Sequence, residues 1–200
     1  MKRIILLLAA VAILLGIWWF FIRKPATHPH AQKEEAIKSG KHSQAFNESI
    51  LKGITSYLSM KDAFVQGDSG VIKSHCRAFI STMDSVNLDD LKMDSSLIYI
   101  TAKQEVSDIK SNASAILLET SLTEMRQDFR MVSENLYPFL KLIGYEGPKL
   151  YWKNCPNAFG ETLEGTWLSN TAVSTNPYYN KNDHSGKTGS ANCGDIKDSL

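Results

Sequence analysis

Apolar residues recur at every third or fourth position through the middle of the chain, a spacing typical of amphipathic helices. It predicts four helices: one over about 43–66, a second ending near residue 86, a third beginning at 94 or 95, and a fourth from about 121 to 144. Short connections between helices of similar length favour an antiparallel up-down bundle. The residues expected to face its core are Phe46, Ile50, Ile54, Tyr57, Leu58, Phe64, Val65, Ile72, Cys76, Phe79, Ile80, Met83, Ile98, Ala102, Val106, Ile109, Leu122, Met125, Phe129, Val132, Leu136 and Leu140.

Residues near the expected helix ends support these boundaries. Asp68 should cap the second helix, and Ser121 and Glu124 have the spacing of a capping box for the fourth. Two features should disturb the helices. Pro138 should kink or shorten the fourth helix, and the polar run Ser111–Ser114 should weaken the third.

The C-terminal segment from about 150 to 195 has no helical period, although it carries two cysteines, two tryptophans and three tyrosines. We expect irregular structure there, and a short irregular segment buries little apolar surface. Bridged cysteines or a bound ion could each stabilise it. The residues leave both alternatives open at this point.

The first residues of the chain indicate a membrane anchor. Residues 4–22 carry no charge, and a helix of about 19 residues nearly spans a hydrocarbon core of about 30 Å. The segment ends in Trp18, Trp19, Phe20 and Phe21, where an aromatic belt belongs, and a cleaved signal peptide would end in small residues. We therefore expect residues 1–24 to be an N-in anchor rather than a signal peptide, with 25–42 a linker and 43–200 a domain outside the cytoplasm.

Charge and motifs narrow the function. Lysine and arginine number 22 against 21 acidic residues, so no nucleic-acid partner is indicated. The chain has no nucleophile elbow, phosphate-binding loop or CxxC pair, and we expect it not to be an enzyme. Cys76 lies on the core stripe and should be a buried small side chain. Arg126 should pair with Glu124 or Asp128, or else cap the base of the C-terminal segment.

Several short motifs occur along the chain in a recognisable order. They are Tyr57–Val65, Arg126, Phe129, Ser133–Leu136, Tyr151, Cys155-Pro156, Ala158, Trp167–Ser169, Asn176–Tyr179 and Cys193-Gly194. On these motifs the stretch from Ser43 to about Asp195 resembles domain of unknown function 3347, found in secreted or membrane-bound proteins of Gram-negative bacteria. That domain is also fused to periplasmic adaptor subunits of copper/silver-type efflux systems.

The resemblance implies soft-metal chemistry, but this sequence departs from the family pattern. The pattern has methionine after the Cys-Pro pair and another before the final Cys-Gly, and thiolate and thioether ligands suit Cu(I). Here Asn157 replaces the first, and residues 180–192 contain no methionine. Two alternatives follow: a disulfide between Cys155 and Cys193, which we favour, or a Cu(I) or other soft-metal site made by Cys155, Cys193 and His184. In the first, a structural cap would be formed by Trp152, Trp167, Asn176, Pro177, Tyr178, Tyr179 and Arg126.

The sequence therefore predicts an all-α protein: a bundle of about four helices with an irregular C-terminal cap, preceded by one transmembrane helix. Two functional hypotheses remain. The first is a non-enzymatic periplasmic domain that accompanies a metal-efflux or other envelope protein and binds copper. The second is a structural or protein-interaction module with a disulfide-closed cap and no metal site.

Overall fold

The computed structural model describes residues 41–160, 163–179 and 190–200. These residues belong to one compact unit, Lys38–Leu200. The expected anchor, residues 25–40 of the expected linker and His184 lie outside the described residues. Within the described ranges no helix is long and apolar enough to cross a membrane.

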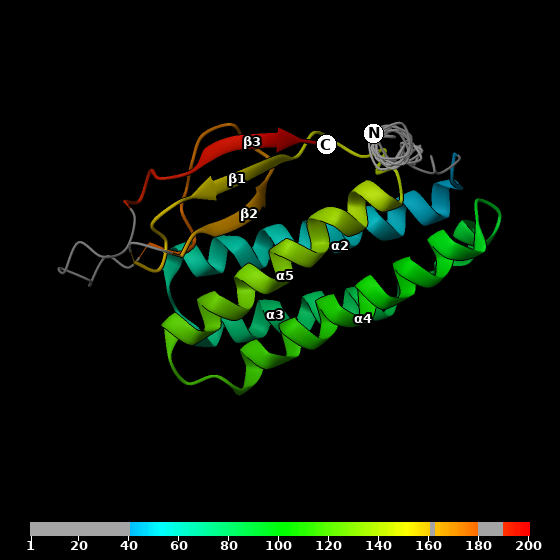
Figure 1. The fold of residues 1–200 in the computed structure, drawn as a ribbon. Helices are drawn as coiled ribbons and strands as arrows, with labels where there is room; N and C mark the ends of the chain where they lie inside the picture. Colours follow the sequence, from blue (N-terminus) through cyan, green and yellow to red (C-terminus); the bar gives the residue numbers. More distant parts are fainter. Residues whose placement is uncertain (1–40, 161–162, 180–189) are drawn as a thin grey trace, which may run out of the picture. The chain divides into compact units, whose positions relative to one another are not determined.

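Four α-helices form the bundle in the described residues, as expected (Figure 1). They are α2 (Gln44–Gln66), α3 (Ser69–Asp84), α4 (Ser96–Leu118) and α5 (Leu122–Leu142). A short 3₁₀ helix, η1 (Asp89–Lys92), connects α3 to α4. The sequence pattern does not predict this turn, because a single helical turn is too short to show a repeat of apolar positions.

The helix ends follow local chemistry. The Asp68 carboxylate accepts hydrogen bonds from the backbone N–H groups of Gly70 (2.8 Å) and Val71 (3.0 Å), which confirms it as the N-cap of α3. Gly67 ends α2 with φ 79° and donates its N–H to Ala63. Ser121 is the N-cap of α5, but its side chain makes no capping hydrogen bond, so the expected capping box is not formed.

Neither the polar run nor Pro138 ends the helix in which it lies. Helix α4 continues through Ser111–Ser114 to Leu118, because Ala113 and Ile116 are packed in the core on either side of the serine at 114. Pro138 lies inside α5 on an exposed face, and the helix continues to Leu142. Packing of the apolar face outweighs the local cost of the proline in α5.

The core matches the expected stripes closely. Tyr57, Phe64 and Phe129 are fully buried, and Cys76 is buried as expected. The clear exception is Val65, which is 41% exposed. Four further expected core residues are only partly buried at the edge of the bundle: Leu58, Ile80, Val106 and Leu122.

The C-terminal cap is a small sheet, so the prediction of an all-α fold with an irregular cap is wrong in this part. The strands are β1 (Tyr151–Cys155), β2 (Gly165–Ser169) and β3 (Asp195–Ser199), in the antiparallel order β2-β1-β3. Figure 1 shows the sheet on the α2 and α5 side of the bundle, with α3 and α4 on the other side. All of β2 is buried and all of β3 is exposed. Strand β2 packs on α5, so the bundle covers the sheet on that side.

Candidate functional site

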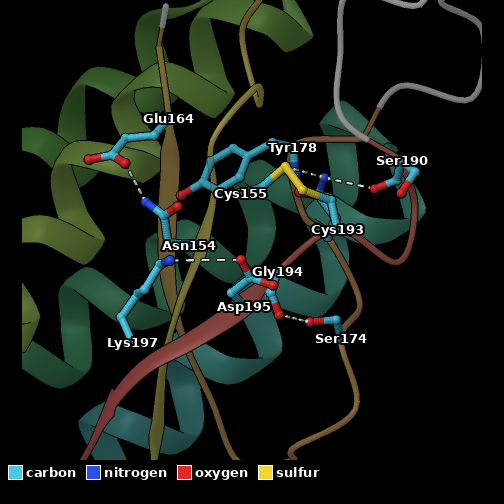
Figure 2. The surroundings of a disulfide bond; sticks show 11 residues. Asn154, Cys155, Glu164, Ser174, Tyr178, Ser190, Cys193, Gly194, Asp195 and Lys197 are labelled. Atoms are coloured by element: carbon cyan, nitrogen blue, oxygen red, sulfur yellow. Dashed lines mark hydrogen bonds and ion pairs between the residues drawn. A yellow bond between two sulfur atoms is a disulfide. The ribbon is translucent and has the colours of Figure 1, made fainter.

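A disulfide closes the cap, as the favoured alternative predicted. Cys155 at the end of β1 is bonded to Cys193, just before β3, with their Cα atoms 5.4 Å apart (Figure 2). The Cys155 side chain is fully buried. The bond joins residues 38 positions apart, and the chain-entropy account gives such a loop about 4 kcal/mol of stability. It therefore holds the end of the exposed strand β3 against the buried part of the sheet.

Asn176 organises the backbone around the disulfide. Its carboxamide nitrogen donates to the Ser190 carbonyl at 3.0 Å and lies 3.7 Å from Cys155 Sγ. Its carboxamide oxygen accepts the backbone N–H of Tyr178 at 2.9 Å, and its own N–H donates to the Ala191 carbonyl. One buried side chain thus fixes the segment before the tyrosine pair to the segment before the second cysteine.

Two glycines permit close packing inside the cap. Gly194 has φ 145°, and a Cβ there would lie 2.5 Å from the Trp167 ring and from Ser174 Oγ. At Gly165 a Cβ would collide with the Tyr178 ring and with Ala158. The buried Trp167 and Tyr178 rings therefore occupy space that any larger residue at these glycines would need.

A buried chain of hydrogen bonds connects the sheet to two helices. The backbone N–H of Leu168 donates to Tyr57 Oη at 3.1 Å, and Tyr57 Oη lies 2.7 Å from Ser133 Oγ. Because Ser133 Oγ donates to the Phe129 carbonyl at 2.9 Å, the tyrosine hydroxyl must be the donor to the serine. Burial raises the pKa of Tyr57 well above its usual value, so the hydroxyl keeps its proton. The chain runs from β2 through α2 to α5 with each of these groups satisfied.

Arg126 caps the base of the C-terminal segment and does not pair with Glu124 or Asp128. Its guanidinium donates to the carbonyls of Pro177 (2.9 Å), Tyr179 (2.7 Å) and Phe64 (3.3 Å). Burial lowers its pKa to about 10. Three backbone acceptors, one from α2 and two from the segment between β2 and β3, therefore meet on one cation from α5.

Aromatic rings complete the junction between cap and bundle. Tyr178 lies 5.9 Å from Phe129, 5.1 Å from Phe159 and 5.8 Å from Trp167, measured between ring centroids. The Tyr178 hydroxyl donates to the Thr166 carbonyl at 2.5 Å. On the central strand β1, Trp152 stacks on Tyr137 of α5, with centroids 4.4 Å apart. Trp152 and Tyr178, two of the aromatic residues expected in the cap, thus contact rings of α5, and Trp167 contacts Tyr178.

Sequence analysis missed the buried lysine of the cap. Lys153 on β1 is fully buried, and its ammonium group donates to the Ala172 carbonyl (2.7 Å) and to Ser174 Oγ (3.1 Å). Burial, and then the nearby charge of Lys61, lower its pKa. The segment was expected to be irregular, so no inward-facing position could be assigned to residue 153. Its side chain is directed inward because residue 153 lies on strand β1.

Residues 54–146 match the family model described as "Protein of unknown function (DUF3347)". Comparison with curated proteins and with solved structures gives no match. The family match supports the resemblance stated from the sequence.

The DUF3347 match covers the helices that hold the cap, and the sheet lies outside it. Tyr57, Arg126, Phe129 and Ser133 all fall within the matched residues, and each contacts the cap or the hydrogen-bond chain leading to it. These are four of the residues on which the sequence resemblance rested. The matched helices therefore contain the residues to which the cap is attached.

The described part of the chain offers no set of metal ligands that would support the soft-metal alternative. Among those residues no group of three or more histidine, cysteine or acidic side chains could hold a metal ion. Cys76 is buried, donates to the Ala113 carbonyl at 2.9 Å, and has its pKa raised by burial to about 12, so it remains a neutral thiol. His42, outside the cap, contacts Asp94 at 3.0 Å and ties the start of α2 to the turn before α4.

Proposed function

We propose that this chain is a non-enzymatic domain anchored in the cytoplasmic membrane of a Gram-negative bacterium, and that its cap binds another envelope protein from the periplasmic side. The observation that carries the proposal is the bond between Cys155 and Cys193. Disulfides persist in oxidising compartments such as the periplasm and are rare in the cytoplasm. The apolar segment at 4–22 supports the anchor.

The disulfide also favours an interaction module over a copper site. Cu(I) binds the thiolate form of cysteine, and in the cap both sulfurs are bonded to each other. The packing around them suits a rigid scaffold: Cys155 is buried and Asn176 bridges the surrounding backbone. We therefore propose that the disulfide of the cap stays oxidised and that the cap binds its partner through the shape of its surface.

The exposed part of the cap supports a protein partner. Strand β3 is an edge strand, because the order is β2-β1-β3, and its five residues are all exposed. Ile196 within it is 47% exposed. Edge strands present unpaired backbone groups that a partner can use. A metal-efflux subunit is one partner that the resemblance suggests.

The first experiment asks whether the cap is oxidised and whether it takes up metal. The full chain is purified from membranes without reductant, and its intact mass is compared before and after reduction and alkylation. We expect one disulfide at Cys155 and Cys193, with no stoichiometric uptake when the oxidised protein is titrated with Cu(I) or Zn(II). Uptake by the oxidised or native protein that Cys155→Ser abolishes would instead support the copper hypothesis.

The second experiment asks for the partner. A photo-crosslinking amino acid placed at Ile196 in cells should give a discrete adduct with another envelope protein. The same probe at Val65, exposed on α2, is the matched control and should not give that adduct. Loss of the adduct in the Cys155→Ser, Cys193→Ser double variant is expected, since β3 then loses its covalent attachment. An adduct that is equally strong at both positions would speak against β3 as the contact.

A further inference from the structure

One exposed stripe of residues runs along α4 and begins at Met93, in the turn between η1 and the helix. Its positions are separated alternately by four and three residues, from 93 to 118, and each of them is exposed. This is the spacing of the a and d positions of a heptad repeat. The stripe consists of Met93, Leu97, Ile100, Gln104, Ser107, Ser111, Ser114 and Leu118.

The apolar members of this stripe are unusually exposed. Met93 is 90% exposed, Leu97 59%, Ile100 64% and Leu118 81%. The other large apolar side chains exposed in the described ranges are scattered over α2, α5 and the cap: Leu51, Val65, Met131, Val173 and Ile196. Helix α4 lies on the side of the bundle away from the sheet (Figure 1), so the cap does not cover this face.

We propose that this face of α4 pairs with the same face of a second copy of this chain, with the two helices parallel. In a parallel pair each position of the stripe meets itself, so Leu97 packs on Leu97 and Ile100 on Ile100 of the partner subunit. Apolar contacts lie at both ends of the helix, and Gln104 and three small serines lie between them. Serine side chains allow the two backbones to approach closely, and the Ser114 hydroxyl already donates to the Lys110 carbonyl at 2.8 Å, so its donor stays satisfied on burial.

The flanking charges select the partner and the direction. Lys103 occupies position g of the repeat and Asp108 occupies position e of the next heptad. In a parallel pair these two positions face each other across the interface. Lys103 is exposed, and the Asp108 carboxylate accepts a hydrogen bond from the neutral Gln104 side chain on its own helix at 2.9 Å. An antiparallel pair would instead set the flank with Lys103 and Lys110 against the same flank of the partner.

Site-specific cross-linking tests the interface in the full chain, reconstituted in lipid nanodiscs. Ile100→Cys should give a covalent dimer with a short bis-maleimide, and Val65→Cys on α2 should not. The native cysteines leave a low background, because Cys76 is buried and Cys155 is bonded to Cys193. Circular dichroism checks that both variants keep the helical fold. Equal yields from the two positions, or none from Ile100→Cys, would overturn the proposal.

Charge reversal tests the direction. Lys103→Asp and Asp108→Lys should each weaken the dimer about threefold, a value in the range of exposed ion pairs, and the double variant should restore it. Failure of the double variant to recover would overturn the parallel pairing, as would a cross-link formed between Ile100→Cys and Ser111→Cys chains but not within Ile100→Cys alone. A monomer whose label at 100 is quenched by nitroxide lipids would overturn the dimer and assign the face to the bilayer.

Discussion

At the scale of single residues, the cap depends on a few buried polar side chains. Tyr57 accepts a hydrogen bond from the backbone of β2 and donates one to Ser133, and Arg126 donates hydrogen bonds to three backbone carbonyls. A buried polar group left without a partner costs about 1–3 kcal/mol. The attachment of the cap is therefore sensitive to single substitutions within the bundle.

Tyr57→Phe tests this attachment. Removal of the hydroxyl leaves the Leu168 N–H buried without an acceptor, so we expect unfolding free energy to fall by about 2 kcal/mol. Urea denaturation followed by circular dichroism measures the change. Tyr99→Phe is the matched control, because Tyr99 is only partly buried and lies on α4, away from the cap. Equal effects of the two variants would show that the hydrogen-bond chain does not stabilise the fold.

The residue scale also shows what sequence could reveal. The core positions of the helices were predictable, because burial of an amphipathic stripe follows from its period; Tyr57 and Phe129 are examples. The role of Arg126 was only one of two alternatives, since its acceptors at 177 and 179 are far along the chain. Contacts between distant backbone carbonyls and a side chain leave no periodic signal.

At the scale of elements, the structure differs most from expectation in the sheet. Each strand has five residues, and β1 contains Lys153 and Asn154 as buried positions. Such short strands give almost no alternation to detect, and β3 lies beyond a long connection. What could be predicted was the disulfide that joins β1 to the start of β3, because the resemblance pointed to both cysteines.

The disulfide is expected to contribute most of the stability of β3. In the Cys155→Ser, Cys193→Ser variant we expect unfolding free energy to fall by as much as about 4 kcal/mol, the chain-entropy value for this loop. Dithiothreitol should lower the melting temperature of the wild-type protein and leave that of the double variant unchanged. A wild-type protein that is insensitive to the reductant would contradict the stabilising role of the bond.

Strand β3 has a second attachment, to α5, that responds to pH. The Asp198 carboxylate accepts hydrogen bonds from the Tyr137 hydroxyl and from Lys141 Nζ, the latter at 3.1 Å. The Tyr137 hydrogen bond is the main cause of a pKa lowered to about 2. A folded-state pKa below the usual value means that this carboxylate stabilises the fold above about pH 4 and loses that effect as the pH falls through about 2.

Acid unfolding of Asp198→Asn tests this attachment. The difference in stability between wild type and variant should be largest near neutral pH and should vanish toward about pH 2. Asp195→Asn is the matched control, because Asp195 lies on the same strand and pairs with Lys197 rather than with α5. The control should keep the wild-type acid response, since Asp198 is still present. A constant difference at all pH values would show that the α5 contact does not depend on the charge.

At the scale of the whole molecule, the disulfide and the apolar segment at 4–22 make the same prediction about location. If residues 1–24 anchor the chain N-in, residues 24–200 lie in the oxidising periplasm, where the Cys155–Cys193 bond persists. Protease added to spheroplasts should therefore digest the domain. When the protein from whole cells is unfolded without reductant and then alkylated, only the thiol of Cys76 should react. A chain without residues 1–24, kept in the cytoplasm, should instead show three alkylated cysteines. A protected domain with all three thiols free in the full chain would place it inside the cell and would remove the basis for a periplasmic partner.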